Sequence, residues 1–380
     1  MSMIKRPFHL QTPTLNALVT RQHPGPDFAD LHARALPPAQ CDQAQETITQ
    51  WPQYDATPLH HLPSLAHQLG IAELICKDEG PRFGLGSFKA LGGAYAVARI
   101  AQEQGPDITV TCATEGNHGR SVAWGAKNAG LRCVIFLHEQ VSPAREQAIA
   151  QYGAEIIRVP GNYDDAVREC ATVAQQRGWQ VVSDTSWEGY EAIPRQVMAG
   201  YSVIAKEIAQ ELPQAPTHVF VQAGVGGIAT AMLTCLYRAW PTAAIHFAVV
   251  EPLSAACLQA SALAGGTPQA VKGPFDTLSA GLACGEPAAA VINVLYEGVQ
   301  SYLAIDDDWI KQAVRLLARP SGSDPHIVAG VSGAAGLGGV LATLGHNDLQ
   351  TAMGLDAQSR VLVLNTETAT DPAAYQEIIA

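Results

Sequence analysis

The stretch "THVFVQAGVGGIATAM", residues 217–232, has the pattern that decides the fold. A β-branched and aromatic run comes first, then a glycine-rich turn, then apolar residues at helical spacing, which predicts a strand, a tight turn and a helix. Because parallel strands need crossover connections, such units favour parallel sheets flanked by helices. We therefore predict an α/β protein, and further strands are expected at "ITVTCA" (108–113), "LRCVIFL" (131–137), "AEIIRV" (154–159), "WQVVS" (179–183), "AIHFAVVE" (244–251) and "RVLVLN" (360–365).

Length and composition limit the possible functions. A chain of 380 residues with 47% hydrophobic content suits two domains, each with a sizeable core. Charged residues make up only 15%, so much of the surface is neutral, which is compatible with a subunit interface and leads us to expect an oligomer. A net charge of −12 without a Lys/Arg cluster excludes nucleic acid and anionic membranes as partners and leaves small molecules.

The cysteines and the chain's apolar segments bear on compartment and on metals. The eight cysteines are scattered and form no C-x-x-C pair, so we predict no zinc site, no other metal and no disulfide framework. Residues 1–20 have no continuous apolar core of a secretory signal, which points to the cytoplasm. The apolar stretch 218–235 is interrupted by polar residues and glycines, so we expect no transmembrane segment.

Helix starts and one irregular region can also be predicted. Ser142 and Asn162 are expected N-caps of two helices, and the acidic residues 306–308 are expected to open a third. Residues 1–55 contain scattered prolines and little periodicity, so we predict an irregular arm over the main body.

Lys89 is notable because the rest of "GLGSFKALGGAYAVA" (84–98) carries no charge. Apolar residues recur at helical spacing from Phe88, and Ser87 is the expected N-cap, so the lysine falls in the first helical turn. The positive end of the helix dipole and the apolar neighbours both disfavour a cation, so we predict a lowered pKa and a nucleophilic amine. The alternative is a surface lysine whose ammonium reaches solvent.

The stretch "ATEGNHGR" (113–120) lies between an expected strand and an expected helix. Ligands of open parallel sheets bind at the carboxyl ends of strands, and the N–H groups that begin the helix would suit a carboxylate or phosphate. The alternative is an ordinary helix cap formed by Asn117, with Glu115 on the surface and His118 in a structural hydrogen bond.

The turn at residues 222–232 allows two interpretations. Its glycines let main-chain amides close around a phosphate. Yet Gly224, Gly226 and Ala229 also satisfy G-x-G-x-x-A, and Glu251 ends the next strand, as in a nicotinamide dehydrogenase. That alternative leaves the isolated lysine and the 113–120 loop unexplained.

Three more segments are expected to lie at or near the functional site. "SDTSWEGYEAIPRQVMAGY" (183–201) places Asp184 at a strand end, where a carboxylate can contact substrate, whereas Trp187 and Tyr190 are expected to pack. "GVSGAAGLGGVLA" (330–342) predicts a close-packed helix behind the site, and "VLVLNTETATDP" (361–372) ends a strand near Asn365.

Together these motifs resemble the fold-type II family of pyridoxal-phosphate (PLP) enzymes, the tryptophan synthase β-like group. "KDEGPRFGLGSFKALGGAYA", "TEGNHGR", "NYDDAV", "DTSWEGY", "AGVGG", "AGLACGEP", "SGAAGLG" and "TETATDP" are most similar to diaminopropionate ammonia-lyases, over about residues 70–372. The resemblance implies two open, mostly parallel twisted sheets, a large PLP-binding domain (1–94 and 202–380, with the arm 1–55) and a small domain (95–201) that is mobile over the active site. It also implies a homodimer.

The resemblance implies PLP as cofactor and assigns residues to it. Lys89 would bind the cofactor's aldehyde, and Asn117 would face its phenolic oxygen. Asn365 or Thr366, both neutral, would face the pyridine nitrogen and leave the ring unprotonated, which suits elimination. The phosphate would lie on the glycine turn, and the remaining cofactor contacts would be Phe88, Gly224, Val225, Gly226 and Gly227.

The same resemblance assigns substrate contacts. Lys89 reaches one face of the substrate's Cα, and Glu115, at the position of an aspartate in the resembled lyases, would take the proton from the opposite face. Asp184 and Tyr163 match residues near the leaving amine. The residues around the substrate carboxylate would be Thr114, Gly116 and His118.

The activity implied is that of an enzyme of amino-acid catabolism, a carbon–nitrogen lyase that converts 2,3-diaminopropionate to pyruvate and two ammonia molecules. "GLGSFK" and "NTET" differ from the usual lyase sequences beside the cofactor, so dehydration of serine, threonine or 3-hydroxyaspartate is the first alternative. A catalytically silent relative is a further alternative, against which the presence of Lys89 argues. Whether Cys257 and Cys284, which flank the expected entrance, meet is left open by the sequence.

Overall fold

The structure is a computed structural model and describes residues 14–20, 28–114 and 116–380. In this part of the chain a seven-stranded sheet has the order β1-β10-β9-β8-β11-β3-β2. Its inner pairs are parallel, whereas the edge strands β1 and β2 run antiparallel to their neighbours. The strands are β1 (Leu15–Val19), β10 (Ser301–Ile305), β9 (His246–Pro252), β8 (His218–Gln222), β11 (Arg360–Asn365), β3 (Glu73–Asp78) and β2 (Leu59–His61).

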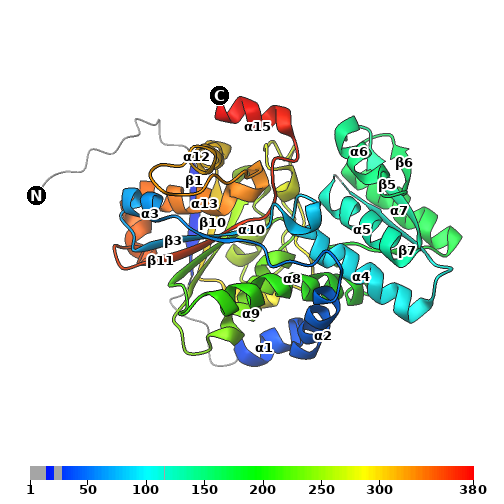
Figure 1. Cartoon of the computed structure of the whole chain (residues 1–380), viewed down its shortest axis with the longest axis horizontal. Helices are drawn as coiled ribbons and strands as arrows, with labels where there is room; N and C mark the ends of the chain where they lie inside the picture. The colour runs from blue at the N-terminus through cyan, green and yellow to red at the C-terminus, as the bar shows by residue number, and fades with distance from the viewer. Residues whose placement is uncertain (1–13, 21–27, 115) are drawn as a thin grey trace, which may run out of the picture.

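A second, four-stranded sheet among the described residues is parallel throughout, with the order β6-β5-β4-β7. Figure 1 shows it in a smaller lobe beside the larger sheet. All its strands lie within 95–201, the range predicted for the small domain, and the exact domain bounds stay a prediction. The strands are β6 (Glu155–Val159), β5 (Arg132–His138), β4 (Thr109–Ala113) and β7 (Gln180–Val181).

Helices cover both faces of each sheet. On the larger sheet, α12 and α13 share one core with one face, while α8 and α9 share another core with the opposite face (Figure 1). The helices are α1 (Phe28–Ala35), α2 (Pro38–Thr49), α3 (Pro63–Leu69), α4 (Lys89–Gln104), α5 (Asn117–Ala129), α6 (Pro143–Ala150), α7 (Tyr163–Arg177), α8 (Ala192–Glu211), α9 (Gly227–Ala239), α10 (Cys257–Leu263), α11 (Ile292–Gly298), α12 (Asp307–Ala318), α13 (Val331–Gly345), α14 (Asn347–Met353) and α15 (Pro372–Ile379).

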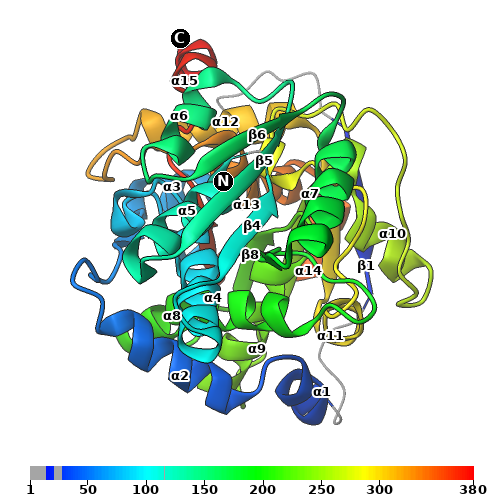
Figure 2. The ribbon, with the colours of Figure 1, turned by 90° about the vertical axis from the view of Figure 1, so that its right-hand side faces the viewer.

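The smaller sheet shows how strand periodicity builds these layers. Along β5, Cys133, Ile135 and Leu137 belong to the core shared with α5, whereas Val134 and Phe136 belong to the core shared with α7. Because successive side chains of a strand point to opposite faces, one apolar run is buried on both sides. Figure 2 shows α5 and α7 on either side of these strands.

Most sequence-based predictions of elements are confirmed. The seven predicted strands all form, and the α/β class with mostly parallel sheets holds. Ser142 accepts a hydrogen bond from the Arg145 N–H, Asn162 forms a capping box with Asp165, and Asp306 caps α12. The helix predicted behind the site is α13, which is buried along most of its length.

The predicted irregular arm is wrong where the structure describes it. Within residues 14–20 and 28–55, β1 pairs with β10 at the sheet edge, and α1 and α2 are helices. Helix α2 buries Cys41, Ala44 and Ile48, which share one helical face. A five-residue edge strand offers too few alternating positions to be recognised without its partner.

Two further observations concern membranes and cysteines. Across residues 14–20, 28–114 and 116–380, no helix combines the length and apolar character needed to cross a membrane. The eight cysteines all lie in the described residues and form no disulfide, and six of them are buried.

Candidate active site

Lys89 is the first residue of α4, as predicted for the first turn of a helix. The expected cap is wrong: Phe88, not Ser87, is the N-cap residue, and its side chain makes no capping hydrogen bond. The chain before Lys89 is instead held by the segment after β11. The Phe88 N–H donates to the Thr366 carbonyl at 3.0 Å, and Ser87 forms an isolated β-bridge with Glu367.

The charge of Lys89 differs from the prediction. Its Nζ contacts Asp184 Oδ2 in an ion pair, and its side chain is 20% exposed. Burial lowers the pKa of Lys89, but the Asp184 carboxylate outweighs burial and holds the pKa above its usual value. The predicted lowering of the pKa is therefore wrong, because a carboxylate far away in sequence faces the amine.

Asp184 lies in the loop after β7 and faces two basic side chains. His118 Nε2 donates to the Val182 carbonyl at 2.8 Å, and its Nδ1 lies 3.8 Å from Asp184 Oδ2. Burial raises the pKa of Asp184, but His118 and Lys89 outweigh it and hold the pKa well below its usual range. The loop thus presents an ionised carboxylate to the Lys89 amine.

Aromatic residues stiffen the Asp184 loop. The Tyr190 hydroxyl accepts from the Ser183 N–H and donates to the Val181 carbonyl, both at 2.9 Å. Trp187 stacks on Tyr190 with ring centroids 4.2 Å apart, which confirms the predicted packing role of both rings. These contacts fix the backbone on either side of Asp184.

The loop before α5 is organised by Thr114. Its hydroxyl accepts the N–H groups of Gly116 at 3.0 Å and Gly119 at 3.1 Å, which fixes the first turn of the helix. Asn117 begins α5, and its Nδ2 donates to Glu367 Oε2 at 2.6 Å. Glu115, the predicted second base, lies outside the described residues.

The glycine turn connects β8 to α9. Gly226 has φ +100°, a conformation that side chains disfavour. An added Cβ at Gly224 would lie 2.8 Å from Cys284 Sγ, and Cys257 Sγ lies 3.8 Å from the Gly224 carbonyl oxygen. Both cysteines predicted near the entrance therefore lie beside the same glycine, and neither forms a disulfide. Val225, in the same turn, accepts a backbone hydrogen bond from Ala288.

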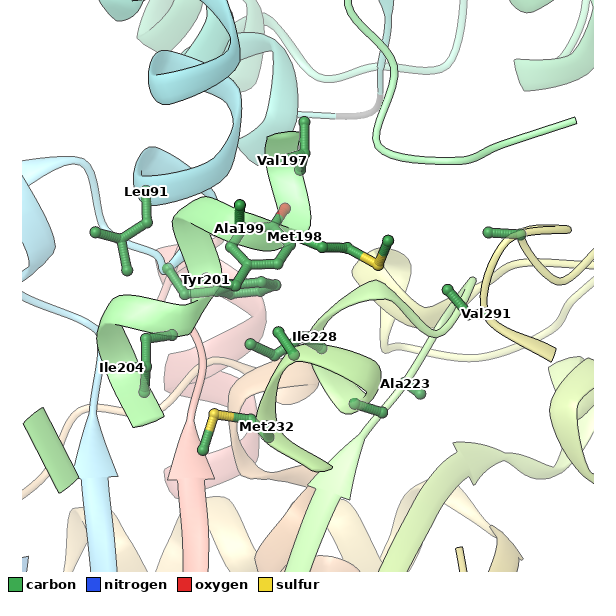
Figure 3. Close-up of a cluster of buried hydrophobic side chains, with 14 of the residues drawn as sticks. Leu91, Val197, Met198, Ala199, Tyr201, Ile204, Ala223, Ile228, Met232 and Val291 are labelled. Carbon is green, nitrogen blue, oxygen red and sulfur yellow. The ribbon is translucent and has the colours of Figure 1, made fainter. Parts of the chain in front are cut away.

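The glycine turn also adjoins the Lys89–Asp184 pair. An added Cβ at Gly227 would lie 3.7 Å from Met198, 3.9 Å from Tyr201 and 4.0 Å from the Asp184 carbonyl oxygen. Figure 3 shows Met198 and Tyr201 on α8 near Ile228 at the start of α9. Tyr201 also packs on the Phe88 ring with centroids 4.7 Å apart. The tertiary structure thus brings the predicted lysine and the predicted phosphate turn together.

Asn365 ends β11 and Thr366 directly follows it, and their side chains have different partners. Asn365 Nδ2 donates to Asp78 Oδ1 at 2.7 Å, so this amide is committed to the neighbouring strand. The Thr366 hydroxyl accepts from Gln222 Nε2 at 2.9 Å, which leaves its own hydrogen to donate. Tyr163 begins α7 in the smaller lobe.

The sequence reasoning missed four residues at this site: Tyr201, Gln222, Glu367 and Ser332. The Ser332 carbonyl accepts from Gln222 Nε2 at 3.1 Å. Glu367 directly follows Thr366 in the motif "NTET", so the motif itself could have drawn attention to it. Nothing in the local sequence marks the other three, because each reaches the site from a separate element.

The residues fit PLP. Helix α9 begins at Gly227, so the N–H groups of its first turn have no partner within the helix and suit a phosphate. A lysine amine adjoins that turn, and a neutral hydroxyl ends the neighbouring strand β11. These groups provide a covalent anchor, a phosphate cradle and a partner for a ring nitrogen.

Comparison with known proteins shows the family. A family model described as "Pyridoxal-phosphate dependent enzyme" matches residues 51–367, so the chain belongs to this family of PLP-dependent enzymes. The chain is similar to diaminopropionate ammonia-lyase of Escherichia coli (strain K12), with 38% identity over 349 residues that cover 86% of this chain and 87% of that protein.

Solved structures agree with this similarity. The holo diaminopropionate ammonia-lyase of Escherichia coli has a TM-score of 0.88 and 34% identity over 97% of each chain. The same enzyme in complex with an "aminoacrylate-PLP azomethine reaction intermediate" has a TM-score of 0.87 and 35% identity, again over 97% of each chain. The predicted resemblance to fold-type II enzymes, the fold class and PLP as cofactor are confirmed.

The dehydrogenase alternative is wrong. Besides the family match, Glu251 is fully buried and accepts the N–H groups of Leu258 and Gln259, each at 2.8 Å. This carboxylate caps the start of α10, so it is committed within the protein and cannot face a ribose.

Proposed function

We propose that the chain eliminates ammonia from 2,3-diaminopropionate, and that water then hydrolyses the released aminoacrylate to pyruvate and a second ammonia. The observation that carries this proposal is the Lys89–Asp184 pair beside the glycine turn, in a chain 38% identical to a diaminopropionate ammonia-lyase. The predicted class, a carbon–nitrogen lyase, is that of this relative. When bound, PLP supplies an electron sink for the charge that develops when Cα loses a proton.

Hydrogen bonds within the chain support the cofactor-binding roles. The N–H groups of the 224–227 turn would hold the phosphate at the positive end of α9. Thr366 is favoured over Asn365 as the partner of the pyridine nitrogen, because its hydroxyl hydrogen can be donated while the Asn365 amide is bound to Asp78. Phe88 precedes Lys89 and packs on Tyr201, which orients the start of α4.

The substrate-binding roles follow the loops that surround Lys89. The carboxylate would bind at the start of α5, through N–H groups near Gly116 and beside His118, since Thr114 already holds this loop in place. Asp184 would stabilise the ammonium that leaves from Cβ, with Tyr163 nearby as a second contact. Lys89 would move the proton at Cα on one face, and Glu115 would take it on the other.

The role of Lys89 is tested by chemical trapping. Borohydride reduction of the holoenzyme, followed by peptide mapping, should place the cofactor on Lys89. Lys89→Ala should abolish pyruvate formation and leave the circular dichroism spectrum unchanged. Full activity of Lys89→Ala, or reduction products on another lysine, would refute this assignment.

The role of Glu115 is tested with both substrate enantiomers. Glu115→Gln should impair one enantiomer of diaminopropionate by about 100-fold and spare the other, because it removes only one of two bases. Equal retention of both activities would rule out a second base at this position.

The substrate itself is tested by a panel. Pyruvate or other keto acids and ammonia should be scored from D- and L-diaminopropionate, serine, threonine and 3-hydroxyaspartate. The sequence departures in "GLGSFK" and "NTET" favour the hydroxy amino acids as the second candidates. A bound cofactor without keto-acid formation from any substrate would instead favour a silent relative.

We also propose a cytoplasmic homodimer with a small domain that moves over the site. The low charged fraction of 15% supports an extensive interface, and eight cysteines without a disulfide suit a reducing compartment. Sedimentation analysis of the holoenzyme should give twice the mass of 40.1 kDa, and a monomer would contradict the dimer.

A further inference from the structure

Glu367 links the two lobes at the site and has no role in the function proposed so far. It follows Thr366 after β11, is 8% exposed, and accepts the hydrogen bond from Asn117 Nδ2 at 2.6 Å. Asn117 belongs to α5 in the smaller lobe, so one short hydrogen bond joins two elements 250 residues apart. Burial at such a junction requires partners for both carboxyl oxygens.

The other side of Glu367 is bound by the start of α13. Ser332 hydrogen-bonds the Glu367 side chain, and Ser332 Oγ accepts the N–H of Gly281 at 3.2 Å. The Ser332 oxygen accepts from Gly281 with a lone pair, and the hydroxyl hydrogen remains available to donate to the carboxyl group. A series of hydrogen bonds therefore connects Gly281, Ser332, Glu367 and Asn117 in that order.

The backbone at the start of α13 lies close to Glu367. An added Cβ at Gly330 would lie 2.9 Å from Glu367 Oε1, and one at Gly333 would lie 2.5 Å from the Glu367 carbonyl oxygen. The Gly330 N–H also donates to that carbonyl at 2.8 Å. Two glycines thus allow the close approach that fixes Glu367 in one position.

The charges and hydrogen bonds around Glu367 are consistent with a carboxyl group that is fixed in position. Burial raises the pKa of Glu367, while the hydrogen bond from Asn117, the charge of Arg145 and the hydrogen bonds from Ser332 oppose the rise. In either protonation state the oxygen that faces Asn117 can accept.

We propose that Glu367 is a positioning residue for the cofactor, acting through Asn117. An amide NH₂ has two hydrogens; Glu367 binds one, which orients the other toward the phenolic oxygen of PLP. This inference rests on the role of Asn117 in the proposed function. It adds a residue that links cofactor binding to two helices, α5 through Asn117 and α13 through Ser332.

A double-mutant cycle tests the proposal. The dissociation constant of PLP is measured by fluorescence titration of the cofactor-stripped enzyme, together with the wavelength of the visible band after reloading. Glu367→Ala should weaken PLP binding by about tenfold and shift the band, because an orienting hydrogen bond is lost. In an Asn117→Ala background the same substitution should have almost no further effect.

Two controls complete the test. Glu367→Gln keeps an acceptor oxygen and should recover most of the affinity, even if Glu367→Ala folds poorly. Glu377→Ala, an exposed glutamate on α15, should leave PLP binding unchanged. Native affinity in Glu367→Ala, equal losses in both Asn117 backgrounds, or no recovery in Glu367→Gln would each overturn the proposal.

The outcomes also separate this inference from the proposed function. If Asn117→Ala alone leaves PLP binding intact, the role of Asn117 fails and the inference fails with it. If the coupling is found but diaminopropionate is not consumed, only the proposed substrate is refuted, since PLP binding is measured without substrate.

Discussion

Gly200→Ala tests the close crossing of α4 and α8, which positions Lys89. Gly200 lies on α8 next to Tyr201, and Figure 3 shows Leu91 of α4 beside this turn. An added Cβ would lie 2.2 Å from the Leu91 carbonyl oxygen and 2.8 Å from its carbonyl carbon. Both atoms belong to the backbone two residues after Lys89, so no side-chain rotation can relieve the overlap.

The expected change in the free energy of unfolding of Gly200→Ala follows from two opposing contributions. Alanine stabilises a helix interior by about 1 kcal/mol relative to glycine. Overpacking in a close-packed interior costs about 1–3 kcal/mol or more, and here α8 must move away from α4 by roughly 1 Å. We expect the overlap to dominate, with a net loss of about 1–2 kcal/mol in the free energy of unfolding.

Urea unfolding followed by circular dichroism, without added PLP, measures this loss. Gly227→Ala is the matched control, because its added Cβ meets no atom closer than 3.7 Å, and we expect its stability to be nearly unchanged. The refuting result is a Gly200→Ala protein as stable as the wild type or more so, since the helix preference alone would then decide the outcome. Displacement of α4 should also weaken PLP binding in Gly200→Ala.

Two other predictions concern charge. Asp184→Asn keeps the side-chain shape but removes the charge facing Lys89, so kcat/KM for diaminopropionate should fall about 100-fold in a pyruvate assay; near-native activity would contradict the role of Asp184. Burial holds the pKa of His218 below 6.5, so the folded state should lose stability as pH falls below 6.5, where the unfolded imidazole takes up a proton. His218→Gln, which keeps a donor for the Met353 carbonyl, should reduce the fall in urea midpoint between pH 7.5 and 5.5, and an identical fall in both proteins would contradict this origin.

Local pattern was sufficient for much of the fold. The β-branched runs, the glycine turn at 224–227 and the capping residues Ser142 and Asn162 act within a few residues, so their structure follows from nearby sequence. The edge strand β1 was missed because its stability comes from pairing with β10, almost 300 residues later.

The features of the active site also fall into two groups, those set by the local sequence and those set by the tertiary structure. The sequence by itself determined which chemical groups are available: a lysine at a helix start, glycine amides at another, and a carboxylate and a neutral hydroxyl at strand ends. Only the tertiary structure decided which of them meet, placing Asp184 against Lys89 and Glu367 against Asn117. The sign of the Lys89 pKa shift was decided there too, because an ionisation equilibrium depends on charges near in space, whatever their separation along the chain.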